Sequence, residues 1–307
     1  MKAGAFGSGF AIALMCIAAS AQASTTIGQA PPPGTLQGGC DSDGVRLSAM
    51  QFSNTTGNSY GVPAGGGVIT SWRSSMIGGG TLQLRVFSAD SSTSAATAVA
   101  QSDPYPLNLQ PVAPQPVRIP VSGGERIGFA LATEGAVGCL ASDNALTDTI
   151  VGTIAGPVGQ PEPPVAQGGF GPQILLNIAA ELEPDADKDG YGDETQDLCP
   201  TQTATQGACA AISFGKPKVD VKKGTAKVIV QVSGAGLVKL TGKSIAAQTK
   251  QSKQAGEITL LLRPKGAAKK KLAKKGKLKV VAEVAFTPTS GGDSIVRTVK
   301  AKLRKKP

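Results

Sequence analysis

Three stretches in the first half of the chain alternate apolar and polar residues with the period of a β-strand. The stretches are TLQLRVFS (81–88), ERIGFALA (125–132) and QILLNIAAEL (173–182). Alternation over such lengths predicts strands with one buried face and one exposed face. Gly- and Pro-rich turn signals separate them at 63–67, 77–80 and 122–125. We therefore expect an all-β head, a β-sandwich of jelly-roll-like type, over residues 24–182.

The second half of the chain shows the same period in a shorter span. Between 212 and 307, strand candidates are KPKVDV, AKVIVQV, GLVKLTG, EITLLLR, KLKVVAEVAF and SIVRTVKAKL, separated by glycines. GAAKKKLAKKGK (266–277) favours a short helix or turn that ends at Gly276. This spacing predicts an Ig-like β-sandwich over residues 212–307, which we call the tail. The tail has no Cys or Trp, so it is not an antibody-type domain.

The N-terminus has the pattern of a secretory signal peptide over residues 1–23. Lys2 is followed by an apolar stretch to about Ala19 and by the small-residue pattern Ala21-Gln22-Ala23. Cys16 follows Met15 rather than a small residue, which argues against the alternative of a lipid anchor. Since no later segment is long and apolar enough to span a membrane, we expect an extracellular, secreted protein, with the cell wall as a candidate location.

Removal of the signal peptide leaves four cysteines, Cys40, Cys139, Cys199 and Cys209. An even number in an exported chain indicates disulfides. Three pairings are open. We favour Cys40 with Cys139 and Cys199 with Cys209, because each bridge then stays within one structural unit. Free thiols are the alternative.

Charge divides the chain into three parts. The net charge is −5 over 24–182, −6 over 183–212 and +20 over 213–307. The protein is thus an acidic head, a strongly acidic linker (183–211) that we call the joint, and a basic tail.

The joint contains PDADKDGYGDETQDLCP (184–200), in which Asp185, Asp187 and Asp189 alternate and Gly190 follows. Carboxylates brought together by a tight turn repel one another, and a hard divalent cation reverses the sign of that interaction. Calcium takes six to eight oxygen ligands from flexible carboxylates and carbonyls, whereas magnesium fits such a site less well. We number the loop from Asp185 as position one, following the EF-hand scheme. Tyr191 at position seven then offers its backbone carbonyl, and Asp193 at position nine ligates directly or through water. We predict a Ca²⁺ site, with a solvated acidic linker as the alternative.

Two residues are candidates for the last ligand of this site. The EF-hand scheme requires a bidentate Glu at position twelve. Gln196 occupies that position, and Asp197 follows it.

The stretch resembles a thrombospondin type 3 repeat, whose pattern is alternating Asp, Gly, further Asp and then Cys-Pro. The resemblance implies Asp185, Asp187, Asp189, Asp193 and Asp197 as ligands and Cys199 as part of a disulfide that closes the loop. This chain departs from the family in having one copy, with one extra residue before the closing Asp. The mature chain as a whole resembles modular exported proteins of actinobacteria.

The tail carries a candidate polyanion-binding patch, with cell-wall polyanions or glycans as candidate partners. The patch is Lys265, Lys269, Lys270, Lys271, Lys274, Lys275 and Lys277, together with 302–307. The alternatives are a solvated surface and lysines that protect sheet edges from pairing. Lysine outnumbers arginine 21 to 3 over 213–307, and Phe214 and Phe286 are the only aromatic residues there, which argues against specific nucleic-acid recognition.

Composition also limits catalysis. The chain has no histidine, which excludes His-based acid/base chemistry and Ser-His or Cys-His nucleophiles. The carboxylates of the head lie in no recognisable motif. We expect a non-catalytic protein of the cell surface or extracellular matrix, with a structural, adhesive or ligand-binding role. The alternative is a carbohydrate-binding or carbohydrate-active head on a wall-associating tail, in which Trp72 and Tyr60 stack on sugars rather than lie in the core.

Overall fold

The chain folds almost entirely into antiparallel β-sheets. The structure, a computed structural model, describes residues 23–31, 36–39, 47–89, 96–132, 135–142, 148–163 and 174–306. Within these ranges strands predominate, and the helix present is α1 (Gly266–Lys275). The predicted all-β sandwich class is confirmed. Among the residues described, no helix has the length and apolar character needed to cross a membrane.

The head consists of three sheets that contribute to one large apolar cluster, beside a smaller cluster of Met50, Phe87, Ala96 and Ala98. The first has the order β1 (Thr25–Gln29), β14 (Ile178–Glu183), β4 (Gly67–Ser74), β8 (Val112–Val121). The second runs β11 (Thr149–Ile154), β3 (Leu47–Ser53), β9 (Arg126–Ala132), β5 (Thr81–Ala89), β6 (Ala96–Gln101), β12 (Pro161–Glu162), with β7 (Tyr105–Pro106) beside β5. The third is β13 (Ile174–Leu176), β10 (Val137–Ser142), β2 (Leu36–Gly39).

The inward faces of these sheets supply the apolar residues that the alternation predicted. Leu82, Leu84 and Val86 of β5 and Ile127 and Phe129 of β9 belong to one buried cluster. Burial of each such side chain stabilises the fold by roughly 1.5–3 kcal/mol. The same cluster contains Trp72, 2 % exposed, and Tyr60, fully buried. The two aromatic side chains considered for sugar stacking therefore lie in the core.

The predicted strand over 173–182 is divided. It forms β13 and β14, which belong to different sheets, and the chain changes sheet at Asn177. The Asn177 side chain is fully buried, donates to the Gly138 carbonyl (2.6 Å) and accepts from the Ser75 amide (3.0 Å). These bonds satisfy a polar side chain that the alternation placed on the exposed face.

The prediction that β5 and β9 are half-buried is wrong, because both are buried on both faces. On the outer face of β5, Gln83 and Arg85 are 3 % and 1 % exposed. Gln83 donates to the Ser102 carbonyl (2.8 Å), and Arg85 is covered by the Pro- and Gly-rich stretch that follows β11. Its described part returns as β12 along β6 and places Glu162 against Arg85 in a buried ion pair.

The tail is a sandwich of two four-stranded sheets. In one, β17 (Thr225–Val232) pairs with β15 (Ile212–Phe214) and β16 (Lys218–Asp220) along one edge and with β20 (Gly256–Leu262) along the other. The second has the order β19 (Gln248–Ser252), β18 (Gly236–Thr241), β21 (Lys277–Pro288), β22 (Ile295–Arg304). The polar strand β19 and the short strand β15 carry too little alternation to be found from the sequence.

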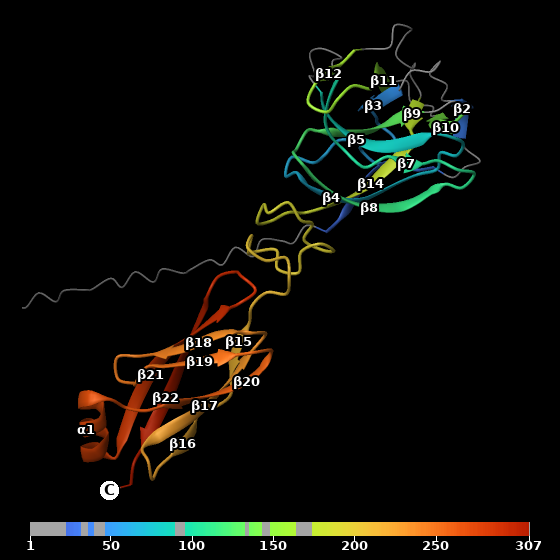
Figure 1. Ribbon diagram of the computed structural model, residues 1–307. Helices are drawn as coiled ribbons and strands as arrows, with labels where there is room; N and C mark the ends of the chain where they lie inside the picture. The colour runs from blue at the N-terminus through green and yellow to red at the C-terminus, as the bar shows by residue number, and fades with distance from the viewer. Residues whose placement is uncertain are drawn as a thin grey trace, which may run out of the picture.

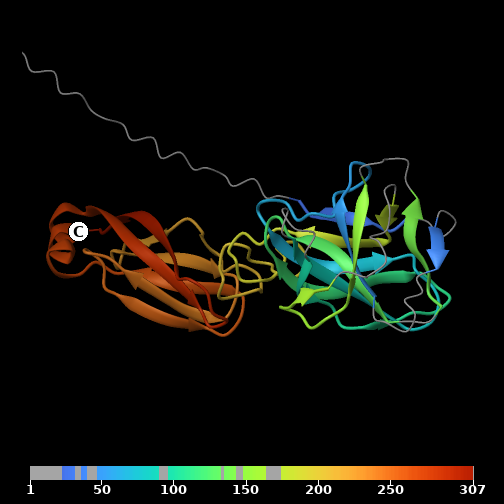
Figure 2. The same cartoon turned by 90° about the horizontal axis from the view of Figure 1, so that it is seen from above.

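The helix α1 closes one end of the tail. It buries Leu272, and Gly276 ends it with a left-handed backbone (φ 65°), as the sequence predicts. Figures 1 and 2 show the head and the tail end to end with the joint between them, and α1 at the far end of the tail.

Candidate metal centre

The joint has no strand or helix between Pro184 and Ala211. A disulfide links Cys199 to Cys209, as favoured from the sequence, and Cys199 is fully buried. Cys139 is disulfide-bonded. Its predicted partner, Cys40, lies outside the described residues.

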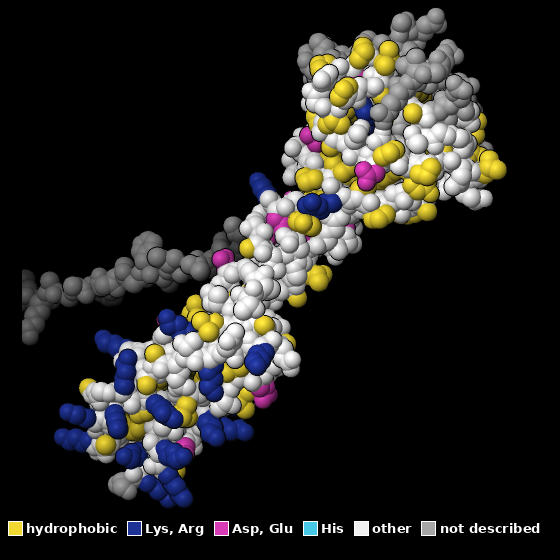
Figure 3. Space-filling view, in the orientation of Figure 1, with side chains coloured by type: hydrophobic (Ala, Val, Ile, Leu, Met, Phe, Trp, Pro, Cys, Tyr) yellow, Lys and Arg dark blue, Asp and Glu magenta, His cyan; other side chains and the backbone are white. Residues whose placement is uncertain are grey.

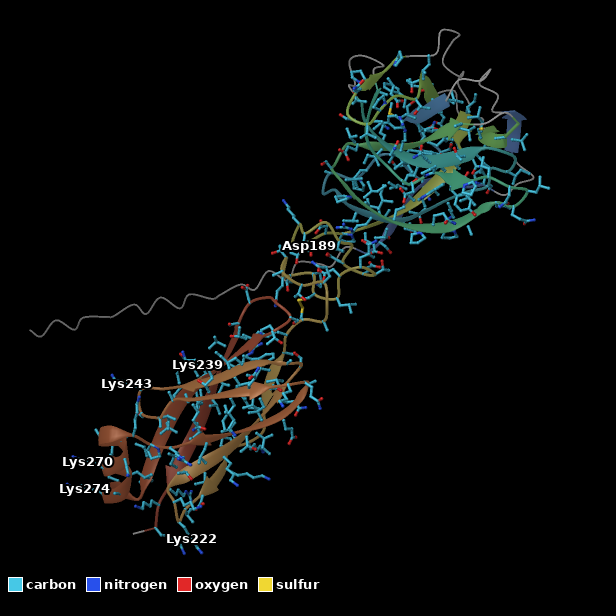
Figure 4. All side chains as sticks on the ribbon, viewed as in Figure 1. Asp189, Lys222, Lys239, Lys243, Lys270 and Lys274 are labelled. Carbon is cyan, nitrogen blue, oxygen red and sulfur yellow. A yellow bond between two sulfur atoms is a disulfide. The ribbon has the colours of Figure 1, made fainter. Side chains whose placement is uncertain are left out.

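Three carboxylates of the joint converge. Asp185, Asp187 and Asp189 each place one oxygen within 4.8 Å of the other two, a grouping that could hold a metal ion. Figure 4 shows Asp189 in the joint, between the two β units.

Local hydrogen bonds shape the loop around these carboxylates. The Asp185 carboxylate accepts from the amides of Asp189 and Gly190, both at 3.0 Å, and Asp189 accepts from the Tyr191 amide at 2.9 Å. The chain reverses through left-handed backbone at Lys188 (φ 61°) and Gly190 (φ 82°). For Lys188 that conformation costs roughly 1–2 kcal/mol, so the loop holds its shape against backbone strain.

Two aspartates have buried oxygens with no hydrogen bond. Both carboxylate oxygens of Asp187 lack a partner, although the Gln202 amide lies close to them. Asp197 is fully buried; its Oδ1 accepts from the Cys199 amide (2.7 Å), and its Oδ2 has no partner. Buried carboxylate oxygens without a donor or a cation are costly and uncommon in native proteins. A cation bound among them would satisfy these oxygens.

The carboxylates of the joint also act on one another electrostatically. Burial raises the pKa of Asp187, and the negative charges of Asp189, Asp197 and Asp185 raise it further, against a smaller lowering by the Gln202 amide. Burial likewise raises the pKa of Asp193, and the charges of Asp185, Asp187 and Asp197 add to this, while a hydrogen bond from the Ala186 amide opposes it. The five predicted aspartate ligands therefore form one electrostatic group.

The structure separates the two candidates for the last ligand. The Gln196 side chain faces the head, where its Nε2 donates to the Val117 carbonyl of β8 (2.7 Å). Its Oε1 accepts from the Gly192 amide (3.4 Å). Asp197, one residue later, is the one with the unpartnered oxygen and a repulsive interaction with Asp187. The extra residue before the closing Asp thus lets Gln196 bind the head.

Tyr191, predicted to contribute its carbonyl, also contacts the head through its ring. The Arg118 guanidinium lies over that ring, 4.2 Å from its centroid. A cation–π contact at such a partly exposed site is worth about 0.5–1 kcal/mol. The loop that carries the acidic cluster is therefore attached to β8 on both sides of Gly192.

Glu183, the last residue of β14, anchors the joint, a role that was not predicted from the sequence. Its carboxylate accepts from Thr195 Oγ1 (2.6 Å), from the amides of Thr195 (2.9 Å) and Glu194 (3.0 Å), and from Thr70 Oγ1 (3.0 Å). Burial raises the pKa of Glu183, but these four bonds together hold it below its usual value. The sequence offered one indication of this role, an acidic residue at the end of a predicted strand. The turn whose amides it binds begins eleven residues later, at Glu194.

The joint also contacts the tail. The Gln202 side chain accepts a hydrogen bond from the Asp293 amide (3.3 Å) in the turn between β21 and β22. A Cβ on the neighbouring Gly292 would lie 2.4 Å from Gln202 Oε1, so the glycine permits this approach. Because the Gln202 backbone lies against Asp187, the same residue connects the acidic cluster to the tail.

These pKa shifts predict the pH dependence of the metal-free joint. Asp187 and Asp193 bind protons more tightly in the folded state, so above their ordinary pKa of 3.8 the folded joint holds more protons. Its stability should therefore fall as the pH rises through their raised pKa values. Glu183 acts in the opposite sense below its ordinary pKa of 4.5, where its contribution is lost as the pH falls. Hydrogen exchange of the Gly190 and Tyr191 amides, measured with a chelator present and corrected for the intrinsic exchange rate, reports the net effect of these three carboxylates on the stability of the joint.

Asp187→Asn should raise protection at neutral pH without metal and reduce its dependence on pH, because the amide replaces a repelled charge. Asp103→Asn, an exposed carboxylate of the head, is the matched control and should change neither quantity. An unaltered pH dependence in Asp187→Asn would contradict the electrostatic account.

The lysines predicted as a polyanion-binding patch are all exposed and lie on and beside α1. Lys269, Lys270, Lys271, Lys274 and Lys275 lie on α1, where consecutive side chains are about 100° apart. They therefore fan out around its exposed arc, and in Figure 4 Lys270 and Lys274 point away from the sandwich. Lys265 precedes the helix, and Lys277 begins β21.

Comparison with known proteins leaves the family open. No protein-family model and no curated protein matches the chain. Among solved structures, two crystal structures of a GH2 β-galacturonidase from Eisenbergiella tayi, bound to galacturonate or to glycerol, are similar at 10 % and 11 % identity with a TM-score of 0.19. Each match covers 91 % of this chain. The chain spans less than half the length of the two galacturonidase chains, 44 % and 43 % respectively.

Proposed function

We propose that the joint binds one calcium ion, which holds the head and the tail in a fixed relation. The observation that carries this proposal is the set of buried carboxylate oxygens without a partner on Asp187 and Asp197. The proposed ligands are Asp185, Asp187, Asp189, Asp193, Asp197 and the backbone carbonyl of Tyr191. This assigns the closing position to Asp197, and the loop then acts as a single repeat of the thrombospondin type 3 kind.

Calcium suits this donor set better than other metals. The five aspartates offer only oxygen, and calcium accepts six to eight oxygens in flexible geometry. Magnesium demands near-ideal octahedral geometry and retains its waters, while zinc prefers nitrogen and sulfur. Both cysteines of the joint are already joined to each other and offer no thiolate.

The ion would act by reversing the electrostatics of the loop. Without it, Asp187 is destabilised by burial and by three neighbouring carboxylates. With it, those charges become ligands, and metal binding adds its free energy to the stability of the folded joint. Because the loop is bonded to the head through Glu183 and to the tail through Gln202, its rigidity is passed to both.

The wider role that fits this arrangement is a secreted, non-catalytic, modular protein of the cell surface or matrix, with an Ig-like tail and a structural or adhesive function. Burial of Trp72 and Tyr60 supports it over a carbohydrate-active head, since neither ring is available to a sugar.

Calorimetric titration with calcium tests the proposal. The parent protein should bind about one ion, and Asp187→Ala/Asp189→Ala should lose the heat because two central ligands are gone. Small-angle scattering should show a narrower distribution of head-to-tail distances in the parent with calcium than with chelator.

The matched control is Asp103→Ala/Glu257→Ala, which removes two exposed carboxylates outside the joint and should leave binding intact. Absence of heat and of any thermal shift for the parent at millimolar calcium would reject the site. Binding without a change in scattering would reject the stiffening role.

A further inference from the structure

Five cations stand on one face of two neighbouring strands in the tail. They are Lys277, Lys279, Lys300, Lys302 and Arg304, and we call them the cationic ladder. The register of β21 and β22 places Lys277 opposite Arg304 and Lys279 opposite Lys302. All five side chains are exposed, while the alternate residues of both strands face the core.

This arrangement opposes stability. Directly opposed residues of an antiparallel pair have Cβ atoms about 4.5–5.5 Å apart, and like charges so placed repel. Neither ion pair in the described part of the chain involves the tail. Along the outer faces of β21 and β22, both fully described, the one carboxylate is Glu283, which lies opposite Thr298 beyond the end of the ladder.

Protection of a sheet edge does not account for the ladder. The edge strand β22 carries three of the cations, and lysine on an edge strand does discourage pairing with another chain. That purpose would be met equally well with Glu or Gln opposite each lysine. The chain instead places Lys277 and Lys279 there, which concentrates positive charge on the face rather than along the edge.

A groove continues the ladder around the edge of β22. It has a volume of about 440 Å³ and lies between β22 and β16. Pro217, Val219 and Val221 line one side, and Lys300, Lys302 and Arg304 line the other. Val219 and Val221 are 38 % and 36 % exposed, so the groove offers an apolar wall beside three charges. The Lys306 amide donates to the Val221 carbonyl (3.0 Å) and closes one end.

We propose that the cationic ladder and this groove bind a linear acidic polysaccharide. Its carboxylate groups would lie along the ladder, where displacement of counterions drives binding, and the apolar faces of its sugar rings would lie against Val219 and Val221. The proposal stands apart from the calcium site.

The chemistry of the surface favours this occupant over a nucleic acid. Lysine acts as a point charge that tolerates varied anion geometry. Bases need an aromatic platform, but Phe286 is fully buried and Phe214 is half-buried. Figure 3 shows the basic side chains concentrated on the tail, with few on the visible face of the head.

Binding of the full-length protein to fluorescent carboxymethyl dextran, with unmodified dextran as the uncharged probe, tests the proposal. The parent should bind only the charged polymer and release it as salt increases. Lys279→Gln/Lys300→Gln/Lys302→Gln should weaken binding about tenfold or more at moderate salt and flatten its salt dependence, since three counterion-releasing contacts are lost.

The matched control removes the same charge from another part of the tail. Lys239→Gln/Lys243→Gln/Lys250→Gln alters three exposed lysines on and beside β18 and β19 and should weaken binding by no more than about twofold, by the reduction in net charge alone. Equal weakening by both triple variants would overturn the ladder as a site. Tighter binding of polyglutamate or of duplex DNA than of carboxymethyl dextran, at equal charge concentration, would overturn the glycan as its occupant.

Thermal unfolding checks that the ladder variant remains folded. Removing opposed like charges should leave its unfolding temperature unchanged or raise it. A lower unfolding temperature would contradict the description of the ladder as a surface maintained at a cost in stability.

Discussion

Replacing both cysteines of the joint, Cys199→Ala/Cys209→Ala, is expected to destabilise the joint by about 3 kcal/mol and to weaken calcium binding. The bridge joins residues ten apart, and closing a loop of this size removes roughly that much chain entropy from the unfolded state. The joint has little else to compensate, because the apolar clusters of the described residues lie almost wholly within the head and the tail.

The effect on calcium follows from Asp197. Its carboxylate is held by the Cys199 amide, so loss of the bridge frees the proposed closing ligand. Hydrogen exchange across 184–209 measures the local stability, and calorimetry measures the affinity for calcium.

The control is Thr203→Ala, an exposed residue within the same loop, which should leave both quantities unchanged. If exchange in the double variant matched that of the control, the disulfide would have no part in ordering the joint.

Glu162→Ala is expected to destabilise the head by about 3–5 kcal/mol, because it leaves the Arg85 charge buried without its carboxylate. Both side chains are almost completely buried, at 1 % and 0 % exposure. Glu162 also accepts from Thr153 Oγ1 of β11 (2.7 Å) and from the Gly156 amide (3.2 Å), so the substitution also removes the bonds that link β12 to β11 and to the loop after it. Urea unfolding followed by Trp72 fluorescence measures the loss.

Arg85→Met/Glu162→Leu should recover part of that loss, since an apolar pair of similar volume restores packing without a buried charge. The comparison within the same head is Glu181→Ala, which breaks a half-exposed pair with Arg73 and should cost less than about 1 kcal/mol. A cost for Glu162→Ala no greater than that of Glu181→Ala would show that the charge is solvated after all.

The elements that the sequence predicted well are those whose signal is local. The alternation of apolar and polar residues located β5, β17 and β21, because successive side chains of a strand point to opposite faces of the sheet. The spacing of Asp185, Asp187 and Asp189 placed three carboxylates together for the same reason. The turn at Gly276 followed from helix-ending chemistry within a few residues.

The residues that escaped prediction act over long sequence distances. Glu162 meets Arg85 from 77 residues away, and that contact turns a half-exposed strand face into a buried one. Asn177 marks a change of sheet that alternation cannot indicate. The Gln196 side chain bonds to the Val117 carbonyl, 79 residues away, and that contact is the basis for proposing Asp197 as the last ligand. In each case the deciding partner is supplied by the tertiary fold.

The disulfide of the joint has a mechanical consequence for a protein that connects two bodies. Ten residues of free chain can be drawn out to about 33–36 Å, but the bridge keeps the Cα atoms of Cys199 and Cys209 4.7 Å apart. Under tension the joint therefore yields about 30 Å less length than its residue count allows. In a single-molecule pulling experiment, the contour length of the unfolded joint should be shorter by this amount while the bridge is intact. Reduction of the disulfide should restore the missing length.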